Sequence, residues 1–350
     1  MTSPPSPTTG RLTGLIEAMA GQPIVMLVDL VADLFITGTP KRISREAPVL
    51  ILSYQGERLI PGGGANAVAN VAALGGRPIP LGIVGDDASG RGLLDAFRER
   101  GISTQGVLVR PGYRTPTKVR ILGGGKHSIK QQIVRYDIEE TLELTAEERD
   151  RFSEALRERE ARVAILSDYG YGTVEPGLLS RMREALGPEA TLVCDSRFRL
   201  GDFRGLDGAT PNEEEAEALL GATIDDDPAR LEEGGRTLLE RLGARFLLVT
   251  RGSRGMSLFE TDVDQIRAAH LPVHGTDQVA DVTGAGDTVI GTFALALAAG
   301  AKPIEAALLA NYAGGVVVMK MGTATLTREE LRHAVESDRH PLEELRWARS

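Results

Sequence analysis

The chain has 350 residues, 42% of them hydrophobic and 25% charged, and a formal net charge of −9 at pH 7, as in an ordinary globular protein with a packed core. It contains no basic block, which argues against a nucleic-acid-binding surface. Its longest nearly apolar run, residues 288–301, is shorter than the ~20 residues that a membrane-spanning helix needs.

The N-terminal segment, residues 1–18, opens with a polar, proline-rich stretch, and we expect it to be a flexible tail. It lacks the charged-then-apolar layout of a signal peptide. The single cysteine, Cys194, excludes an intrachain disulfide and a zinc site built from several thiolates. We therefore expect a cytoplasmic protein with no nucleic-acid or membrane partner.

Apolar runs and helix-like segments then alternate along the chain. Continuous apolar runs suit strands that are covered on both faces, as in a parallel sheet. The expected strands lie within residues 23–35, 78–87, 161–170, 191–197 and 244–252, and the expected helices within residues 64–76, 89–101 and 145–160. This alternation predicts one α/β domain over residues 19–340, with a doubly wound, mostly parallel sheet flanked by helices, and a C-terminal tail over residues 341–350.

Two segments break the alternation. Residues 39–63 and 115–137 have the pattern of strand pairs joined by turns, with no helix between the strands. We interpret them as a small accessory β-sheet, with strands from about residues 36–61 and 115–136, that is inserted into the α/β body and acts as a lid.

Nearly every expected strand ends in a polar or acidic residue. Ligands of doubly wound sheets bind beyond the carboxyl ends of the strands, so Asp33 and Asp168 are candidate substrate-binding residues. The alternative interpretation is that these residues are ordinary polar starts of loops.

A dinucleotide site is a weaker hypothesis. Residues 62–67, "GGGANA", fit the loose pattern G-x-G-x-x-A, and Asp86 follows about 20 residues later. However, Pro61 and a polar, lid-like segment precede the glycines where a buried first strand belongs. A nicotinamide-dependent dehydrogenase is therefore the least favoured function.

The stretch "DVTGAGDTVIG", residues 281–291, favours phosphoryl transfer. Thr283 is a candidate N-cap, and the small residues Gly284, Ala285 and Gly286 expose the first N–H groups of the helix that follows, which form an anion site. Asp287 projects from the first turn, where it can act as a base. The alternative is an acidic residue that merely favours a helix N-terminus.

Three motifs in the same order resemble the ribokinase-like (PfkB) carbohydrate kinases: "PGGGANAVANVAALG", "TPNEEE" and "DVTGAGDTVIG". Further segments, "RISREAPV", "LSDYGYG", "VTRGSRGMSL" and "ANYAGGVVVMKMGTATL", are most similar to the D-glycero-β-D-manno-heptose 7-phosphate kinase domain of that family. The resemblance covers residues 24–327 and implies a ribokinase-like fold that uses ATP and Mg²⁺.

The same resemblance implies roles for individual residues. Asp287 matches the catalytic base, and Gly284, Ala285 and Gly286 match the anion hole for the phosphoryl group in transfer. The other implied site residues are Asp33, Gly63, Gly64 and Asn66 for the sugar; Asn212, Thr250, Arg251, Gly252, Gly255 and Asn311 for the nucleotide; Glu215 for Mg²⁺, directly or through water; and Asp281 for a monovalent cation such as K⁺.

A sugar phosphate needs local cations, because the negative net charge of the protein repels an anionic substrate. Lys118 and Arg120 share one face of a strand by their period-two spacing. Arg42 or Arg135 from the lid is expected to join them. The alternative for each arginine is a solvated surface side chain.

Several residues depart from the heptose kinase pattern. Val28 replaces a glycine, Tyr171 replaces the lysine of "SDYAKG", and "DSR" at residues 195–197 replaces "DPK". Ser196 and Arg197 keep only part of that motif, and Arg and Lys bind phosphate differently. These changes leave the reaction type intact and the identity of the sugar open.

The preferred reaction is therefore transfer of the γ-phosphoryl group of ATP to the anomeric hydroxyl of a heptose 7-phosphate. The alternatives are a kinase for fructose, ribose or 2-keto-3-deoxygluconate, and a non-catalytic sugar- or nucleotide-binding regulator on the same fold. The resemblance further implies a homodimer formed through the lid. Relatives often carry a fused nucleotidyltransferase, and we expect this chain to carry the kinase alone.

Overall fold

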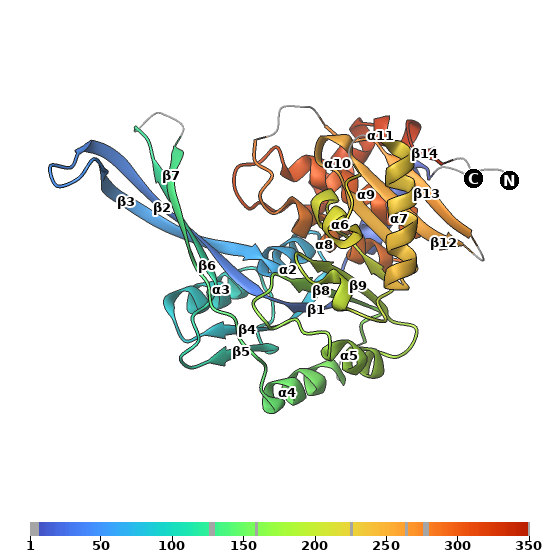
Figure 1. The fold of residues 1–350 in the computed structure, drawn as a ribbon, viewed down its shortest axis with the longest axis horizontal. Coiled ribbons are helices and arrows are strands. Elements are labelled where there is room, and N and C mark those ends of the chain that lie inside the picture. The colour runs from blue at the N-terminus through green and yellow to red at the C-terminus, as the bar shows by residue number, and fades with distance from the viewer. Residues whose placement is uncertain are drawn as a thin grey trace.

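The computed structural model describes residues 7–125, 130–157, 160–224, 227–262, 265–275 and 280–348. Within these ranges the strands form a ten-stranded sheet in the body of the molecule and a four-stranded sheet that projects from it (Figure 1).

The large sheet has the order β14-β13-β12-β11-β10-β9-β8-β1-β4-β5. Its strands are parallel from β11 to β5, and β12, β13 and β14 continue one edge in antiparallel fashion. Their bounds are β1 Pro23–Val28, β4 Arg77–Gly85, β5 Val107–Arg110, β8 Val163–Asp168, β9 Thr191–Ser196, β10 Gly208–Ala209, β11 Phe246–Thr250, β12 Met256–Asp262, β13 Gln265–Leu271 and β14 Arg346–Trp347.

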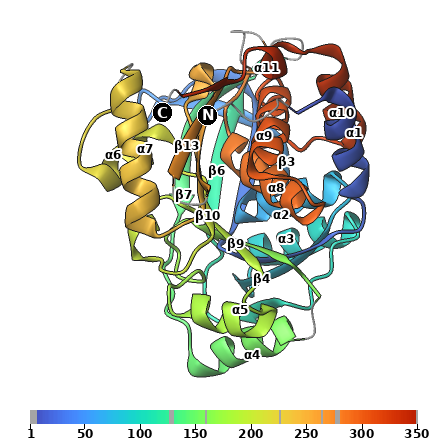
Figure 2. The ribbon, with the colours of Figure 1, turned by 90° about the vertical axis from the view of Figure 1, so that its right-hand side faces the viewer.

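Helices cover both faces of this sheet (Figure 2). In β1, Ile24 and Met26 belong to one buried cluster and Val25 and Leu27 to the other, as the alternation of a strand requires. One face carries α1 Thr9–Ala18, α2 Gly64–Ala73, α3 Ala88–Glu99, α8 Ala285–Ala298, α9 Pro303–Val317, α10 Arg328–Ser337 and α11 His340–Glu343; the other carries α4 Ala146–Arg157, α5 Leu178–Leu186, α6 Glu213–Leu220 and α7 Pro228–Leu242. The predicted doubly wound, mostly parallel architecture is confirmed.

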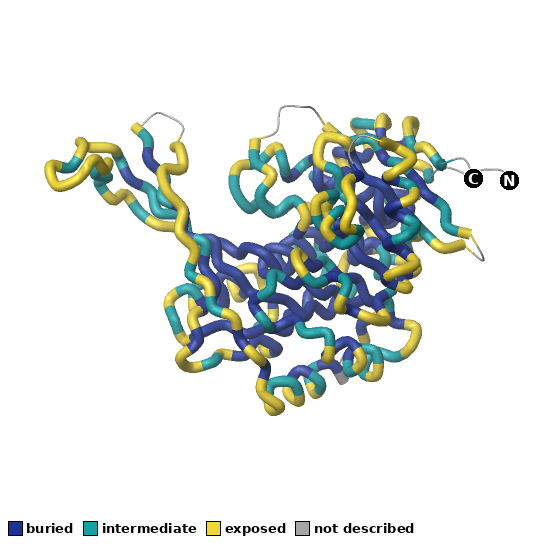
Figure 3. The backbone as a smooth tube through the Cα atoms, viewed as in Figure 1, coloured by how far each residue is buried: buried dark blue, intermediate teal, exposed yellow. Residues whose placement is uncertain are grey.

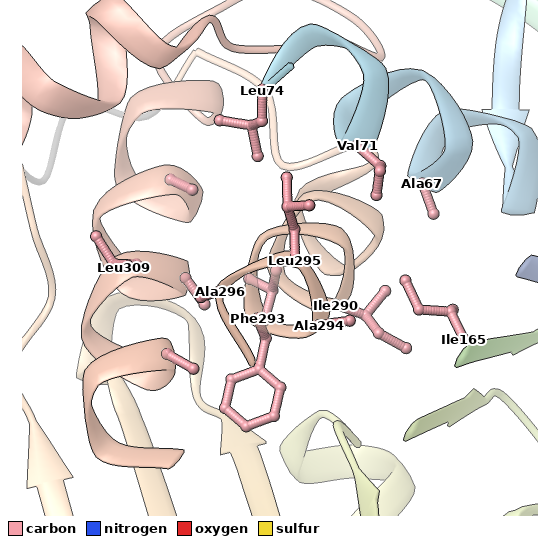
Figure 4. Close-up of a cluster of buried hydrophobic side chains, with 14 of the residues drawn as sticks. Ala67, Val71, Leu74, Ile165, Ile290, Phe293, Ala294, Leu295, Ala296 and Leu309 are labelled. Carbon is pink, nitrogen blue, oxygen red and sulfur yellow. The ribbon is translucent and has the colours of Figure 1, made fainter. Parts of the chain in front are cut away.

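Helix α8 is buried between α2 and α9 (Figure 4). Its side chains Ile290 and Phe293 are fully buried, and Figure 4 shows Ile290 facing Ile165 of β8. Packing on all sides fixes the helix and therefore fixes the position of its first turn at the carboxyl end of the sheet.

The expected tails are wrong for residues 9–18, 341–343 and 346–347, which form regular structure, and residues 1–6 and 349–350 lie outside the described ranges. Helix α1 occupies residues 9–18, and Leu12, Leu15 and Ile16 are buried in the main core because the short apolar stripe of this helix packs against α10. At the other end of the chain, β14 pairs with the edge strand β13, where Trp347 lies opposite Ala269.

The four-stranded sheet has the order β3-β2-β6-β7, formed by β2 Leu30–Ile43, β3 Leu50–Gly63, β6 Thr117–Gly123 and β7 Gln131–Ile138. Its outer part is mostly exposed (Figure 3). Both segments predicted for the lid therefore form one sheet. The single strand expected over residues 23–35 is wrong, because the chain leaves the large sheet at Asp29 and Asp33 already belongs to the lid.

None of the helices in the described ranges is long and apolar enough to cross a membrane.

Candidate active site

The first turn of α8 places Asp287 in a buried position, with 2% of its surface exposed. The N-cap is Gly284 rather than the expected Thr283. Gly284 has φ +78°, and a Cβ there would lie 2.5 Å from Nδ2 of Asn66. Only glycine allows this left-handed turn to pass so close to Asn66.

Two donors from different elements hold the Asp287 carboxylate. Nδ2 of Asn66, on α2, donates to Oδ2 at 3.1 Å. The hydroxyl of Tyr169, in the loop after β8, donates to Oδ1 at 2.7 Å. The carboxylate therefore has a fixed orientation at the carboxyl end of the sheet, where doubly wound proteins bind their ligands.

Burial raises the pKa of Asp287 to about 7, against the lowering effects of Tyr169, Asn66 and Lys118. A carboxyl group with this pKa is present in both protonation states near neutral pH, which is the property that a general base requires. A carboxyl at a solvated helix N-terminus has no cause for such a shift.

The backbone N–H groups around Asp287 differ in whether they have a hydrogen-bond acceptor within the protein. The N–H of Ala285 donates to the carbonyl of Val282 at 3.2 Å, so it is not free for an anion as expected. Among the described residues, the N–H groups of Gly286 and Asp287 have no acceptor. These two donors, at the positive end of the α8 dipole, are suited to an oxyanion or a phosphate.

Asp33 contributes a second carboxylate near the same end of the sheet. Its Oδ1 forms an ion pair with Arg120 at 2.5 Å, and its Oδ2 accepts a hydrogen bond from the Thr323 hydroxyl at 2.6 Å. A Cβ at Gly62 would lie 2.6 Å from Asp33 Oδ2, and one at Gly64 would lie 2.6 Å from the carbonyl oxygen of Asp29. These glycines therefore let the backbone approach the two aspartates closely.

The charge of Lys118 interacts with the carboxylates of both Asp33 and Asp287. Its ammonium is 5.2 Å from the centre of the Tyr169 ring. Burial lowers the pKa of Lys118, and the carboxylates of Asp33 and Asp287 act in the opposite direction. Gly63, with φ +50°, faces the same tyrosine: a Cβ there would lie 3.2 Å from the Tyr169 ring.

A pocket of about 860 Å³ opens between the lid and the body. Its lining includes Phe35 and Arg120 from the lid, Asn66 from α2, and Asp281 and Thr323 from the segments on either side of α8 and α9. Of the predicted sugar-side residues, Asn66 and Arg120 line this pocket, and Asp33 binds Arg120.

Arg42 and Asp168, both predicted substrate residues, lie apart from this group. Arg42 is exposed, seven residues beyond Phe35 on β2 and past the end of the pairing with β6, which corresponds to roughly 23 Å along the strand. Asp168 is buried, and its carboxylate binds Arg199 Nη2 at 2.6 Å and the Ser196 hydroxyl at 2.6 Å. The Asp168 carboxylate is therefore neutralised by Arg199 within the protein.

The predicted nucleotide-side residues gather after β9, β10 and β11. Asn212 caps α6: its Oδ1 accepts from the Glu215 N–H at 2.9 Å, and a Glu215 carboxylate oxygen accepts from the Asn212 N–H at 2.9 Å. Asn212 also forms a β-bridge with Thr250, and Arg251 forms an ion pair with Glu213 at 2.8 Å. The motif "NEEE" is thus a capping box that fixes the loop beside β11.

The remaining predicted nucleotide-side residues are Gly252 and Gly255, which form a turn, and Asn311, which holds a loop. Gly252 and Gly255 have φ +55° and +78°, and a Cβ at Gly255 would lie 2.0 Å from the carbonyl oxygen of Leu271. Asn311, buried on α9, donates its Nδ2 to the carbonyl of Pro272 at 2.7 Å. Asn311 therefore anchors the segment that follows β13.

Two further carboxylates, those of Asp195 and Glu215, have raised pKa values, although the charge of Arg197 lowers that of Glu215. Burial raises the pKa of Asp195 well above its usual range, and the charges of Glu215 and Asp287 raise it further. Burial also raises the pKa of Glu215. Within the described ranges no group of three or more His, Cys, Asp or Glu side chains has the arrangement of a metal site. Two carboxylates nevertheless fit Mg²⁺, which is commonly held by one or two carboxylates together with substrate phosphates.

Asp281 is held at the other side of α8. Its carboxylate accepts the N–H groups of Thr283 at 2.9 Å and Gly322 at 3.0 Å. Burial raises the pKa of Asp281, but these hydrogen bonds outweigh that effect and leave the pKa below its usual value. Asp281 is therefore a fixed negative charge at the edge of the pocket.

The sequence did not predict the roles of Tyr169, Thr323 and Asp29 in the site. Tyr169 and Thr323 reach Asp287 and Asp33 from distant loops. Asp29 accepts the N–H groups of Tyr169, Tyr171 and Thr173 at 2.9–3.0 Å and so fixes the loop that carries Tyr169. The motif "LSDYGYG" contains Tyr169, but the departure from the heptose kinase pattern lies at Tyr171. Tyr171 points elsewhere, because its hydroxyl donates to Glu139 at 3.0 Å.

Comparisons with known proteins agree with this geometry. Residues 35–330 match the family described as pfkB family carbohydrate kinase. The chain is 39% identical over 343 residues to a bifunctional protein HldE of Mesorhizobium japonicum, and 37% identical over 315 residues to that of Pelobacter propionicus. These alignments cover 95% and 89% of this chain but only 65% and 62% of the relatives, so the chain spans less than two thirds of their length.

Solved structures show the same fold. Escherichia coli phosphofructokinase-2, in complex with substrates and products, matches with a TM-score of 0.71 at 17% identity over 90% of this chain and 99% of the other. Arabidopsis thaliana ribokinase, complexed with ribose and ATP, matches with a TM-score of 0.69 at 20% identity over 91% of this chain and 99% of the other. The predicted ribokinase-like fold is confirmed.

Proposed function

This chain belongs to the pfkB family of carbohydrate kinases and is a sugar kinase, and we propose that it transfers the γ-phosphoryl group of ATP to the anomeric hydroxyl of D-glycero-D-manno-heptose 7-phosphate. One observation carries the phosphotransfer: a buried Asp287 with a pKa of about 7 begins a helix whose Gly286 and Asp287 N–H groups have no acceptor among the described residues.

The proposed step needs one base and one anion site. Asp287 takes the proton of the attacking sugar hydroxyl as that oxygen forms its bond to the γ-phosphorus, and the bond from this phosphorus to the β–γ bridging oxygen breaks to leave ADP. Tyr169 and Asn66 keep the Asp287 carboxylate aimed at that hydroxyl. The N–H groups of Gly286 and Asp287 stabilise the negative charge on the phosphoryl oxygens in transfer.

Cations complete the charge balance. We propose that Asp195 and Glu215 hold Mg²⁺, with or without intervening water, because burial raises the pKa of both carboxylates and a bound cation would stabilise their charged forms. Bound Mg²⁺ supplies charge neutralisation for the phosphates. Asp281, which remains charged, is the proposed contact of a monovalent cation such as K⁺.

The heptose assignment rests on similarity. The segments that resemble heptose 7-phosphate kinases lie within the same part of the chain that aligns with the proteins named HldE. The pocket is consistent with an anionic acceptor, because Arg58, Arg100, Arg120, Lys130 and Lys320 all line it. A neutral sugar has no need of these cations.

We further propose a homodimer formed through the lid. Ile36, Ile121 and Val134 lie opposite one another on adjacent strands, and so do Val119 and Tyr136, which gives the lid an apolar face. Val134 and Tyr136 are 47% and 50% exposed in the single chain. A second lid is a suitable cover for this face. Because the donor is ATP, we place the enzyme in the cytoplasm.

The test is release of ADP from Mg-ATP with a panel of acceptors: heptose 7-phosphate, fructose, fructose 6-phosphate, ribose and 2-keto-3-deoxygluconate. We expect turnover on heptose 7-phosphate and a loss of roughly 10²–10⁴-fold in kcat for Asp287→Asn, with ATP binding retained. Asp86→Asn is the matched control, because Asp86 also follows a strand but is exposed and pairs with Arg91.

The outcomes separate the parts of the proposal. Turnover on another sugar keeps the kinase and rejects the heptose assignment. Full activity of Asp287→Asn rejects the assignment of the base. Binding of ATP and sugar by the native protein without any turnover supports a regulator instead.

A further inference from the structure

The exposed methionines of the described chain lie together in the loop after α9. Met319 and Met321 are 46% and 71% exposed. The other methionines within the described ranges are at most 7% exposed: Met19, Met26, Met182 and Met256. A thioether has to be accessible in order to react with a peroxide in solution. Among the described residues, the methionine sulfur atoms that such an oxidant can reach are therefore confined to residues 319–321.

The single cysteine does not compete for the oxidant. Cys194 is fully buried on β9, and burial raises the pKa of its thiol well above the usual range. The thiolate is the form of cysteine that reacts with peroxides, so a buried thiol with a raised pKa is inert. An effect of peroxide on the folded protein is therefore expected to come from the loop after α9.

This loop is bound to the candidate site at two carboxylates. The N–H of Gly322 donates to Asp281 Oδ2 at 3.0 Å, and the hydroxyl of Thr323 donates to Asp33 Oδ2 at 2.6 Å. The N–H of Asp281 donates in turn to the carbonyl of Val318 at 3.1 Å. The residues on both sides of the two methionines are therefore tied to the acceptor side of the site.

The two methionines differ in their relation to the pocket. Met321 lines it, as do the apolar side chains of Phe35 and Ile60 from the lid, whereas Met319 does not. The lid also lies against the next residue of the loop, because a Cβ at Gly322 would lie 3.7 Å from the Phe35 ring. Met321 is therefore part of the wall that an acceptor in the pocket meets.

We propose that Met321 is a site of reversible oxidation, at which a peroxide converts the thioether to a sulfoxide and thereby weakens the binding of the acceptor. A lone pair of the sulfur attacks one oxygen of hydrogen peroxide, the O–O bond breaks, and this oxygen stays on the sulfur. The other oxygen takes up a proton and leaves as water. The sulfur gives up an electron pair and the peroxide accepts it, and a methionine sulfoxide reductase reverses the change.

The modification makes part of the pocket wall polar. Oxidation turns a flexible apolar side chain into a polar one, here beside Phe35 and Ile60. An acceptor that lies against Met321 then has to remove water from the sulfoxide oxygen, which opposes binding. The site itself goes beyond the proposed function, whereas its effect on the acceptor rests on the proposed sugar kinase activity.

The first experiment treats the native protein with increasing doses of hydrogen peroxide and locates the added oxygen by peptide mass spectrometry. We expect oxidation of Met319 and Met321 before that of the buried methionines, at doses that leave the circular dichroism spectrum unchanged. Heptose 7-phosphate in the pocket is expected to slow the oxidation of Met321 but not that of Met319. An unmodified Met321 in protein whose Met319 is completely oxidised overturns the proposal.

The second experiment measures kinetics after the same treatment. We expect KM of the native enzyme for heptose 7-phosphate to rise by roughly threefold to tenfold, with the KM for ATP little changed, because the loss is one of acceptor binding. Met321→Leu conserves the volume of the side chain without its sulfur and is expected to keep its KM. Met319→Leu is the matched control and is expected to respond as the native enzyme does. An equal rise in KM for native enzyme and Met321→Leu overturns the role of Met321.

Failure of this inference is distinguishable from failure of the proposed function. The mass measurement needs no turnover, so selective oxidation of Met321 in a protein that phosphorylates another sugar supports the site and rejects only the heptose. An enzyme that is active on heptose 7-phosphate and keeps its KM after complete oxidation of Met321 overturns the inference and leaves the proposed function in place.

Discussion

A single carboxyl group determines the expected pH dependence. The proposed base Asp287 must be ionised to accept a proton, and burial raises its pKa to about 7. We therefore expect kcat/KM to rise with pH up to about 7 and then to level off. The same shift favours the protonated form in the folded state, so stability falls as pH rises from the unfolded pKa near 4 through about 7.

Tyr169→Phe tests this account. The Tyr169 hydroxyl donates to Asp287 and lowers its pKa, so removing the hydroxyl is expected to move the acid limb of the kcat/KM profile to higher pH. Tyr171→Phe is the matched control, because the Tyr171 hydroxyl donates to Glu139 instead. An unchanged acid limb in Tyr169→Phe, or an equal shift in both variants, contradicts the role assigned to Tyr169.

The sequence predicts some residues of the candidate site and misses others, for reasons that can be identified. Asp287 and Gly284 follow from local pattern, because a helix start is a local structure. The contact of Tyr169 with Asp287 joins residues 118 positions apart and has no local signature. Asp168 was assigned from its place at a strand end, which gives no sign that Arg199 neutralises it.

The N-terminal helix α1 contributes more to the hydrophobic core than its composition suggests. Helix α1 is short and has few large apolar side chains, yet Leu12 is fully buried in the core next to α10. Arg11 on the same helix pairs with Glu305 of α9 at 2.9 Å. A proline-rich start and only three buried side chains concealed this helix in the sequence.

Leu12→Ala is therefore expected to lower the free energy of unfolding by roughly 2–5 kcal/mol, the usual effect of emptying a buried leucine site. Glu17→Ala, on the exposed side of the same helix, is expected to change it by less than about 1 kcal/mol, since the ion pairs of Glu17 with Arg328 and Arg332 lie at the surface. Urea denaturation of both variants checks this difference. Equal unfolding midpoints for the two variants contradict docking of α1.

The lid shows how an element can be predicted while its contacts are not. Turn chemistry and the lack of an intervening helix indicated both strand pairs, and all four strands are present. Register is a property of two strands together, so the sequence did not place Arg58 beside Arg120 or remove Arg42 from the site. The exit of β2 from the body at Asp29 was also hidden, because residues 23–35 form one apolar run.

For the whole molecule, the two-faced lid predicts an association state. If the apolar face pairs with a second lid, Val134→Lys places a charge in that interface and is expected to convert a dimer into a monomer. Sedimentation velocity measures this change, and Arg42→Ala, a lid variant of opposite charge effect, is expected to remain dimeric. A native protein that sediments as a monomer at micromolar concentration contradicts the proposed dimer.

The overall architecture was the most predictable feature. Buried strands alternate with helices along the chain, and this pattern requires a sheet covered on both faces. The antiparallel edge of β12, β13 and β14 was not anticipated, because β14 has only two residues and pairs across a long separation in the sequence.

The docking of β14 on the large sheet also places an intrinsic fluorescence probe at the edge of that sheet. Trp347 is the only tryptophan in the sequence, and its ring lies 5.8 Å from the guanidinium carbon of Arg267 at the edge of the large sheet. Intrinsic fluorescence therefore reports whether the C-terminal strand is docked, and it is insensitive to the lid, which joins the sheet at β1, seven strands away from β14. The emission of Trp347 is therefore expected to change with denaturant but not with sugar. Detection of lid movement requires a second fluorophore on the lid itself.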